Sequence, residues 1–208
     1  MAASGFQRVL ESPVATYEEG LQFFRGEGMI NETLRRLAQD HDRHGIEYCV
    51  VGAVALNQHG YHRFTESIDV LLSPEGLETF RRELIGHGYR PAFQGASRRF
   101  RETVRNVPIE VLVAGEYPGD GKPKSVRFEV SGAHVEVIDG IRTVSLTKLI
   151  ELKLASGMTA PGRLKDLADF QELIRVRDLD AGTAAHLDPL VRDRYLELLA
   201  GVDEARRQ

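Results

Sequence analysis

The segment Val50–Leu72, VVGAVALNQHGYHRFTESIDVLL, constrains the fold more than any other part of the sequence. An apolar run stops at Gly52, a short helical pattern ends near Gly60, and the strand pattern SIDVLL follows. Because side chains alternate across a strand, Asp69 faces away from its two apolar neighbours. The segment predicts a strand–turn–helix–strand unit with one carboxylate on its second strand. Taken alone, Asp69 also fits an ordinary amphipathic strand with a solvated polar face.

The rest of the chain predicts helices at both ends and strands in the middle. Residues 5–45 are helical in pattern with a break at 25–28, and the pattern is helical again from residue 145. Residues 98–104 and 107–115 read as paired strands, and residues 126–130 and 134–138 as a hairpin. Asn31 and Ser73 are predicted helix N-caps, with Pro74 at the first helical position.

These patterns predict an α+β fold, with a small mixed β-sheet flanked by helices and with N- and C-terminal helical segments. We expect an N-terminal helical extension at residues 1–30, an α/β core at 31–144, and a C-terminal helical part at 145–208. Because no linker-like composition separates them, the parts are expected to pack as one compact unit.

Composition and charge narrow the class of protein. No stretch reaches the ~18 consecutive apolar residues of a membrane span, and the first residues lack a secretory signal pattern. We therefore expect a cytoplasmic protein that makes no membrane contact. The net charge of −4 argues against non-specific coating of nucleic acid. Cys49, the only cysteine, falls in an apolar run and is expected to be buried and reduced.

A second isolated carboxylate, Glu110, interrupts the apolar strand pattern VPIEVLVAG. A carboxylate in such a strand has to be solvated, paired or bound to a metal, because burying it bare is costly. If the two strands are neighbours, Asp69 and Glu110 converge, and carboxylate oxygens are the ligands that Mg²⁺ prefers. Gly52 adds a turn at a helix start, where free backbone N–H groups favour phosphate.

Two further clusters have alternative interpretations. Arginines crowd the stretch SRRFRETVR, and a strand there would place Arg99 and Arg101 on one face. They fit a solvated edge strand protected by charge, or a docking surface for the phosphates of a polyanionic acceptor. His59 and His62 have no cysteine or third histidine placed nearby, so a zinc site is not expected.

The order of these features resembles the signature of the nucleotidyltransferase superfamily, the minimal DNA-polymerase-β-like fold. In that pattern an apolar strand ends in Gly followed by Gly or Ser, and Asp-x-Asp follows on a strand after about a dozen residues. RFTESID is similar to the R-x-T-x-D-I-D of a bacterial branch, and IEVLV to the strand of the third carboxylate. KLIELKLASGMTAPGRLKDLADFQEL is similar to helices of the abortive-infection and toxin-type members, so the resemblance covers roughly residues 32–174.

The resemblance implies an enzyme that transfers a nucleoside monophosphate from a nucleoside triphosphate to a hydroxyl acceptor with Mg²⁺. It implies catalytic roles for Asp69, Glu110, Lys165 and Asp166, and metal binding by Asp69 and Glu110. It implies nucleotide binding by Gly52, Ala53, Arg63, Ser67 and Lys153. The partners it implies are the nucleoside triphosphate, an RNA or protein acceptor, and a second copy of the chain or an antitoxin-type partner.

Three positions depart from the pattern. Ala53 replaces Gly or Ser but keeps its backbone N–H, and Glu110 replaces the commoner Asp. Ser67 stands where the first Asp belongs, and Glu66 is expected on the opposite face. A neutral hydroxyl removes one of three charges from a site meant for two cations. An atypical nucleotidyltransferase and a catalytically degenerate nucleotide- or partner-binding module of a toxin–antitoxin or defence system both fit this departure.

The C-terminal acid–base cluster also has a purely structural explanation. On one helix Lys165 and Asp169 are four residues apart, and Arg163 and Asp166 are three apart. Both spacings suit surface ion pairs. Lys153 fits either a contact with the triphosphate or an ordinary lysine on a helix surface.

Overall fold

The apolar segments form a seven-stranded mixed β-sheet in the order β3-β4-β5-β2-β1-β7-β6. The computed structural model describes residues 5–207, so residues 1–4 of the expected N-terminal extension and residue 208 lie outside it. The pairs β2–β5 and β1–β7 are parallel, and the other neighbours are antiparallel. The strands are β1 (Tyr48–Val51), β2 (Ile68–Leu72), β3 (Tyr89–Pro91), β4 (Arg99–Glu102), β5 (Pro108–Val113), β6 (Val135–Ile138) and β7 (Ile141–Val144).

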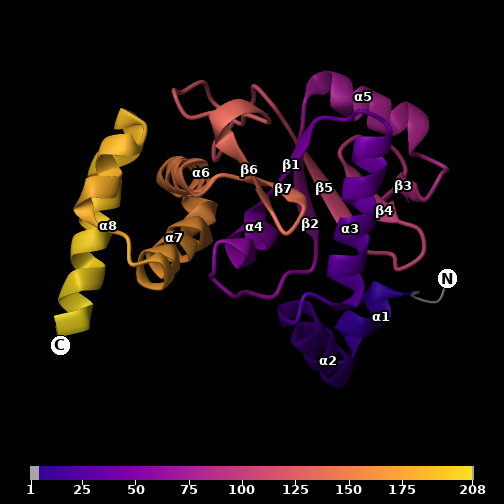
Figure 1. Cartoon of the computed structure of the whole chain (residues 1–208), viewed down its shortest axis with the longest axis horizontal. Coiled ribbons are helices and arrows are strands. Elements are labelled where there is room, and N and C mark those ends of the chain that lie inside the picture. Colours follow the sequence, from indigo (N-terminus) through magenta and orange to yellow (C-terminus); the bar gives the residue numbers. More distant parts are fainter. Residues whose placement is uncertain (1–4, 208) are drawn as a thin grey trace.

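Helices precede, interrupt and follow the sheet, and they cover both of its faces (Figure 1). The expected α+β architecture, with helical segments at both ends, is confirmed. The α-helices are α1 (Phe6–Glu11), α2 (Pro13–Phe24), α3 (Gly28–Arg43), α4 (Gly52–Gln58), α5 (Pro74–Glu83), α6 (Leu146–Thr159), α7 (Leu164–Arg177) and α8 (Pro189–Arg207).

Each face of the sheet has its own apolar core. Alternate residues of β1, β2 and β5, such as Val50, Val70 and Val111, pack with α3 and α5. The opposite face, which includes Cys49 and Leu71, packs with α6, α7 and α8. Figure 1 shows α1 to α3 at one end of the molecule and α8 at the other, with α4, α6 and α7 between the sheet and α8. The core on the α6–α7 side surrounds the candidate site.

Local signals placed some elements correctly. The Ser73 hydroxyl accepts a hydrogen bond from Gly76 N at 2.9 Å, with Pro74 opening α5, so the predicted cap is confirmed. Cys49 is fully buried, and burial raises the pKa of its thiol to about 12. Among residues 5–207, no helix combines the length and apolar character needed to cross a membrane.

Other local signals were misleading. Asn31 lies inside α3 rather than at its start, because the Glu19 carboxylate of α2 accepts from Met29 N at 2.7 Å and caps the helix from outside. Residues 126–130 belong to no strand, so the predicted hairpin is wrong, although its second strand corresponds to β6. The hairpin is β6–β7, turning at Asp139-Gly140 with φ of 50° and 78°. β4 is paired on both sides, so it is not the expected edge strand.

Candidate functional site

Asp69 and Glu110 lie side by side on adjacent parallel strands. Asp69 on β2 is in register with Glu110 on β5, and both point to the α6–α7 side of the sheet because their neighbours fill the other core. The predicted adjacency of the two carboxylates is confirmed. Their surroundings differ, because Asp69 is partly buried whereas the Glu110 side chain is 49% exposed and lies 3.7 Å from the Arg99 guanidinium.

Gly52 brings the end of β1 against the Asp69 carboxylate. Its backbone lies in the left-handed region, with φ of 64°, at the first residue of α4. A Cβ added there would overlap Oδ2 of Asp69. The glycine is therefore required twice, once by its conformation and once by the close approach of the carboxylate.

The electrostatics of Asp69 follow from this position. Burial, together with the neighbouring Glu110 charge, raises the pKa of Asp69 to about 6, against the opposing effects of Lys153, Ser67 and Arg63. A carboxylate with a raised pKa is one whose charge the fold stabilises poorly. A cation bound at this point would therefore gain from an incompletely compensated negative charge.

Ser67 lies just before β2, in a bend rather than on the strand. Its hydroxyl donates a weak hydrogen bond to Oδ1 of Asp69, with the oxygens 3.5 Å apart. Ser67, Glu66 and Glu110 all line a groove of about 430 Å³ that also contains Arg99. Glu66 lies in the same bend, before the strand begins, so its expected orientation opposite to Ser67 stays a prediction.

A buried ionic cluster fills the space between α4, α6 and α7. The Lys153 ammonium donates to Asp166 Oδ1 at 2.6 Å and to Asp169 Oδ2 at 2.7 Å. The Arg63 guanidinium donates to both oxygens of Asp169, at 2.8 and 3.0 Å. The Ser156 hydroxyl donates to the second oxygen of Asp166 at 2.6 Å. The cluster joins four charged side chains whose partners lie on other elements.

These contacts show whether the carboxylates of α7 form surface ion pairs along their own helix or pair with residues of other elements. In the ion pairs of residues 5–207, Asp166 pairs with Lys153, and Asp169 pairs with Arg63 and Lys153. The local surface pairs of Asp166 and Asp169 on their own helix are absent from that part of the chain. Lys153 is only 8% exposed, so it is not a helix-surface lysine. Lys165 is exposed, and no ion pair within the described part of the chain includes it.

Two adjoining hollows meet at Asp69 and the ionic cluster of Lys153 and Asp166. The first, of about 250 Å³, is lined by the predicted Gly52, Ala53, Arg63, Asp69, Lys153, Lys165 and Asp166, together with Gly162, Arg163 and Asp169. The second, of about 140 Å³, is lined by Asp69 and by apolar residues such as Leu112, Leu149 and Leu152. Both share Gly52, Asp69, Lys153, Arg163 and Asp166. The predicted site residues other than Ser67 and Glu110 therefore surround one connected space.

Sequence reasoning missed two members of this site. Arg163 lines both hollows, and Ser156 fixes Asp166, although neither was a candidate. The sequence signal for Ser156 is its position one helical turn after Lys153, with which it shares a face of α6.

Among the described residues no group of three or more histidine, cysteine or carboxylate side chains could hold a metal ion. His59 instead contacts the Val144 carbonyl at 2.8 Å.

Comparisons with known proteins support the fold. No family model and no curated protein matches the sequence. The antibiotic-resistance factor ANT(2'')-Ia in solution aligns with a TM-score of 0.50 at 14% identity, over 84% of this chain and 96% of that one. The chain thus has the nucleotidyltransferase-like fold.

Two further solved structures are more distant. ANT(2'')-Ia in complex with adenylyl-2''-tobramycin has a TM-score of 0.45 at 13% identity, over 80% of this chain and 92% of that one. An antigenic nucleotidyltransferase-like protein from Paracoccidioides brasiliensis also has a TM-score of 0.45, at 16% identity, over 69% of this chain and 74% of that one.

Proposed function

We propose that this chain binds a nucleoside triphosphate and transfers its nucleoside monophosphate to a hydroxyl group of an RNA, a protein or a small molecule. The observation that carries the proposal is the register of Asp69 with Glu110 beside a hollow lined by four cationic side chains. In this proposal the α/β core, residues 31–144, contributes the carboxylates, and the C-terminal helical part from residue 145 contributes most of the cations.

The triphosphate is assigned to the hollow of about 250 Å³. Arg163 and Lys165 are exposed there, and no carboxylate partner within residues 5–207 neutralises them. Arg63 adds a buried Nε with no hydrogen-bond partner in the described chain. A buried donor without a partner is costly, and a phosphate oxygen would satisfy it. Lys153 contributes positive charge at the wall while it remains bonded to Asp166 and Asp169.

The donor set suits one Mg²⁺ better than two. Asp69 and Glu110 offer oxygen ligands from adjacent strands, and Mg²⁺ typically binds one or two carboxylates together with substrate phosphates. Asp69 and Glu110 would hold the ion, which would supply charge stabilisation to the transferring phosphoryl group. The chain's own task is to hold the triphosphate against Gly52 and to keep an acceptor hydroxyl on the Glu110 side.

A second candidate function is nucleotide binding without transfer. Ser67 favours it, because this neutral hydroxyl occupies the position of the first acid and leaves two carboxylates where the superfamily pattern has three. Such a module would bind the triphosphate in the same hollow and act through a partner, for instance an antitoxin-type protein. The two candidates share the binding step and differ only in turnover.

One pair of measurements tests both. Calorimetric titration with each nucleoside triphosphate, with and without Mg²⁺, should detect binding that Lys165→Gln weakens severalfold, because an exposed cation facing the phosphates is lost. Arg207→Gln, at an exposed position on α8, is the control and should bind like the wild type. Labelled-nucleotide transfer then separates the candidates. Absence of binding to every nucleoside triphosphate would contradict both.

A further inference from the structure

We propose that the hollow of about 140 Å³ is the subsite for the nucleobase, an inference that rests on the function proposed above. The two hollows differ in chemistry. Charged groups surround the larger one. The smaller one shares some of these charged groups at its junction with the larger hollow, and its remaining walls are mostly apolar: Val51, Leu112, Pro118, Phe128, Leu149 and Leu152. A nucleotide has the same division, with a charged triphosphate at one end and a planar base with apolar faces at the other.

Because the two hollows share lining residues, one nucleotide could occupy both of them. Gly52, Asp69 and Lys153 line both spaces, so they mark the junction where the α-phosphate and ribose would lie. A triphosphate bound beside Lys165 would direct the base towards Phe128 and Leu152. The base would leave water for an apolar pocket, and stacking on an aromatic ring contributes about 1–3 kcal/mol per base.

A closed loop forms the outer wall of the subsite. Its neck is fixed by two backbone hydrogen bonds, from Gly115 N to the Phe128 carbonyl and from Phe128 N to the Glu116 carbonyl, both 2.9 Å. Between these points, residues 116–127 project over α6 like an Ω-loop. Phe128 therefore sits at the neck, where the backbone pairing fixes its position.

The tip of the loop is packed against the end of α6. Gly119 has φ of 75°, and a Cβ there would overlap the Thr159 hydroxyl and lie 2.9 Å from the Ser156 carbonyl oxygen. The Lys124 ammonium donates to the Pro118 carbonyl at 2.8 Å and to Asp120 at 2.7 Å. These contacts hold Pro118 and Gly119 against the hollow, so the wall is formed before any ligand enters.

The polar groups near this wall already have partners. The Ser156 hydroxyl donates to Asp166, and the Pro118 carbonyl accepts from Lys124. The loop side of the hollow consequently offers contact with the faces of a base and little hydrogen bonding to its edges. The charged lining residues Asp69, Lys153, Arg163 and Asp166 all belong to the side shared with the larger hollow. Because edge hydrogen bonds are what distinguish bases of similar size, adenosine and guanosine triphosphates should bind with affinities within about threefold of each other.

The test compares a nucleoside triphosphate with inorganic tripolyphosphate, which carries the charges but has no base. Both are titrated with Mg²⁺ into the wild type, Phe128→Ala and Phe128→Leu. Phe128→Ala should weaken adenosine triphosphate binding about tenfold or more and leave tripolyphosphate binding unchanged. Phe128→Leu, which keeps the apolar volume and loses the ring, should give a smaller loss. Phe24→Ala, an exposed phenylalanine on α2, is the matched control and should change neither affinity.

The controls distinguish the possible failures. Tripolyphosphate binding and the thermal melting temperature report whether each variant is folded, and Phe128→Leu carries the test if Phe128→Ala does not fold. Equal wild-type affinity for tripolyphosphate and adenosine triphosphate would overturn the base subsite and leave the phosphate site standing. Unchanged adenosine triphosphate binding in both Phe128 variants would do the same. A wild type that binds neither compound would overturn the proposed function itself, and the subsite with it.

Discussion

The Asp69 carboxylate packs directly on the α-carbon of Gly52, at a point where any side chain on residue 52 would overlap Oδ2. This contact joins the end of β1 to β2, since Val51 and Asp69 are cross-strand partners. The carboxylate is held by the fold before any ligand arrives, so its position is a property of the polypeptide alone.

Gly52→Ala should therefore be more destabilising than a glycine substitution at an equally strained open position. Gly45 provides the matched control, since it has φ of 63° and no atom within 4 Å of an added Cβ. Gly45→Ala should lose about 1 kcal/mol from the left-handed backbone alone. Gly52→Ala should lose about 1–3 kcal/mol more because of the overlap with Asp69. Urea denaturation measures both, and equal losses would contradict the packing described for Asp69.

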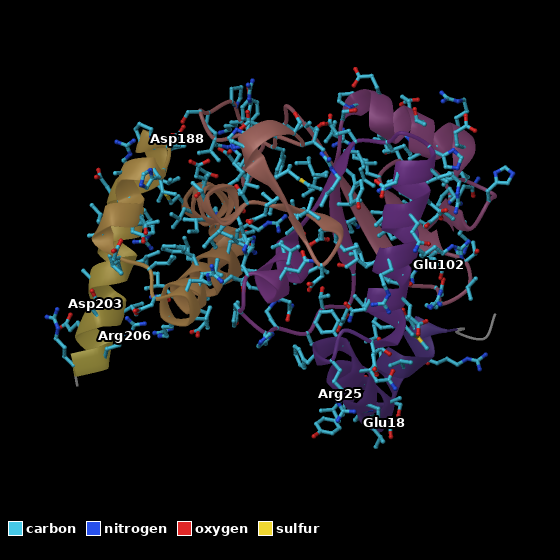
Figure 2. All side chains as sticks on the ribbon, viewed as in Figure 1. Glu18, Arg25, Glu102, Asp188, Asp203 and Arg206 are labelled. Carbon is cyan, nitrogen blue, oxygen red and sulfur yellow. The ribbon has the colours of Figure 1, made fainter. Side chains whose placement is uncertain are left out.

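Asp169→Asn should destabilise the protein by about 3 kcal/mol, because it removes a buried charge that neutralises both Arg63 and Lys153. Asp203→Asn is the matched control, in an exposed pair with Arg206 on α8 (Figure 2). It should change the unfolding free energy by less than about 0.5 kcal/mol. Thermal or chemical unfolding compares the two. Equal effects would mean that the buried cluster adds no more than a surface pair.

The contribution of His41 to the stability of the wild type should fall as the pH is lowered from about 6.5 towards 3. Asp69, whose pKa is raised to about 6, acts in the opposite direction below that pH. Burial lowers the pKa of His41 to about 3, and neither ring nitrogen has a hydrogen-bond partner in the described chain. At His41 the unfolded chain binds the proton near pH 6.5, whereas the folded chain does not. The contribution of this residue to stability is therefore full above pH 6.5 and is lost below it. The loss attributable to this residue is about 1.4 kcal/mol per pH unit.

His41→Phe should remove this component, because the ring keeps its contacts with Tyr48 and Phe80 and no longer titrates. His62→Phe, at an exposed position, is the matched control and should keep the wild-type slope. Urea denaturation at several pH values between 4 and 8 gives the slopes. An identical pH dependence for wild type and His41→Phe would show that His41 does not carry the acid sensitivity.

Ser67→Asp should tighten Mg²⁺ binding in the presence of a nucleoside triphosphate, because it adds a carboxylate at a residue whose hydroxyl oxygen now lies 3.5 Å from Oδ1 of Asp69. Without metal the same change should lower stability slightly, since like charges repel. Ser131→Asp, on an exposed turn, should do neither. Metal titrations and labelled-nucleotide transfer compare the three proteins. Efficient transfer by the wild type that Ser67→Asp abolishes would show that Ser67 is a functional adaptation.

Local sequence signals predicted the core of this fold because its elements are locally consistent. The glycine turn, the short α4 and the acid on β2 lie within one segment, and the alternation of Ile109, Glu110 and Val111 placed the second acid on the matching face. A lone carboxylate among apolar residues is visible in a sequence without any knowledge of its partner. Asp69 and Glu110 share this feature, since each is the single carboxylate in an apolar strand, and the feature predicts that their two strands are neighbours.

Partners far apart in the chain could not be predicted in the same way. Helical spacing predicts Lys165 and Arg163 as the ion-pair partners of the carboxylates on α7. In the structure Asp169 is buried and pairs instead with Arg63 and Lys153, which lie outside α7. The missed hairpin has a different cause. The sequence contains the turn signal Asp139-Gly140. The strand-like pattern of residues 126–130 nevertheless favours a different hairpin, which turns between residues 130 and 134.

The bond between Arg63 and Asp169 joins residues 106 positions apart, and the parallel pairing of β1 with β7 joins Val50 to Thr143. Closing such long loops costs chain entropy before the contacts form, so folding of this chain is slow relative to a helical bundle of the same length. Synthesis proceeds from the N-terminus, and the sheet strands that carry Asp69 and Glu110 emerge before α6 and α7. A nascent chain thus holds Asp69 and Glu110 before Lys153, Arg163 and Lys165 leave the ribosome.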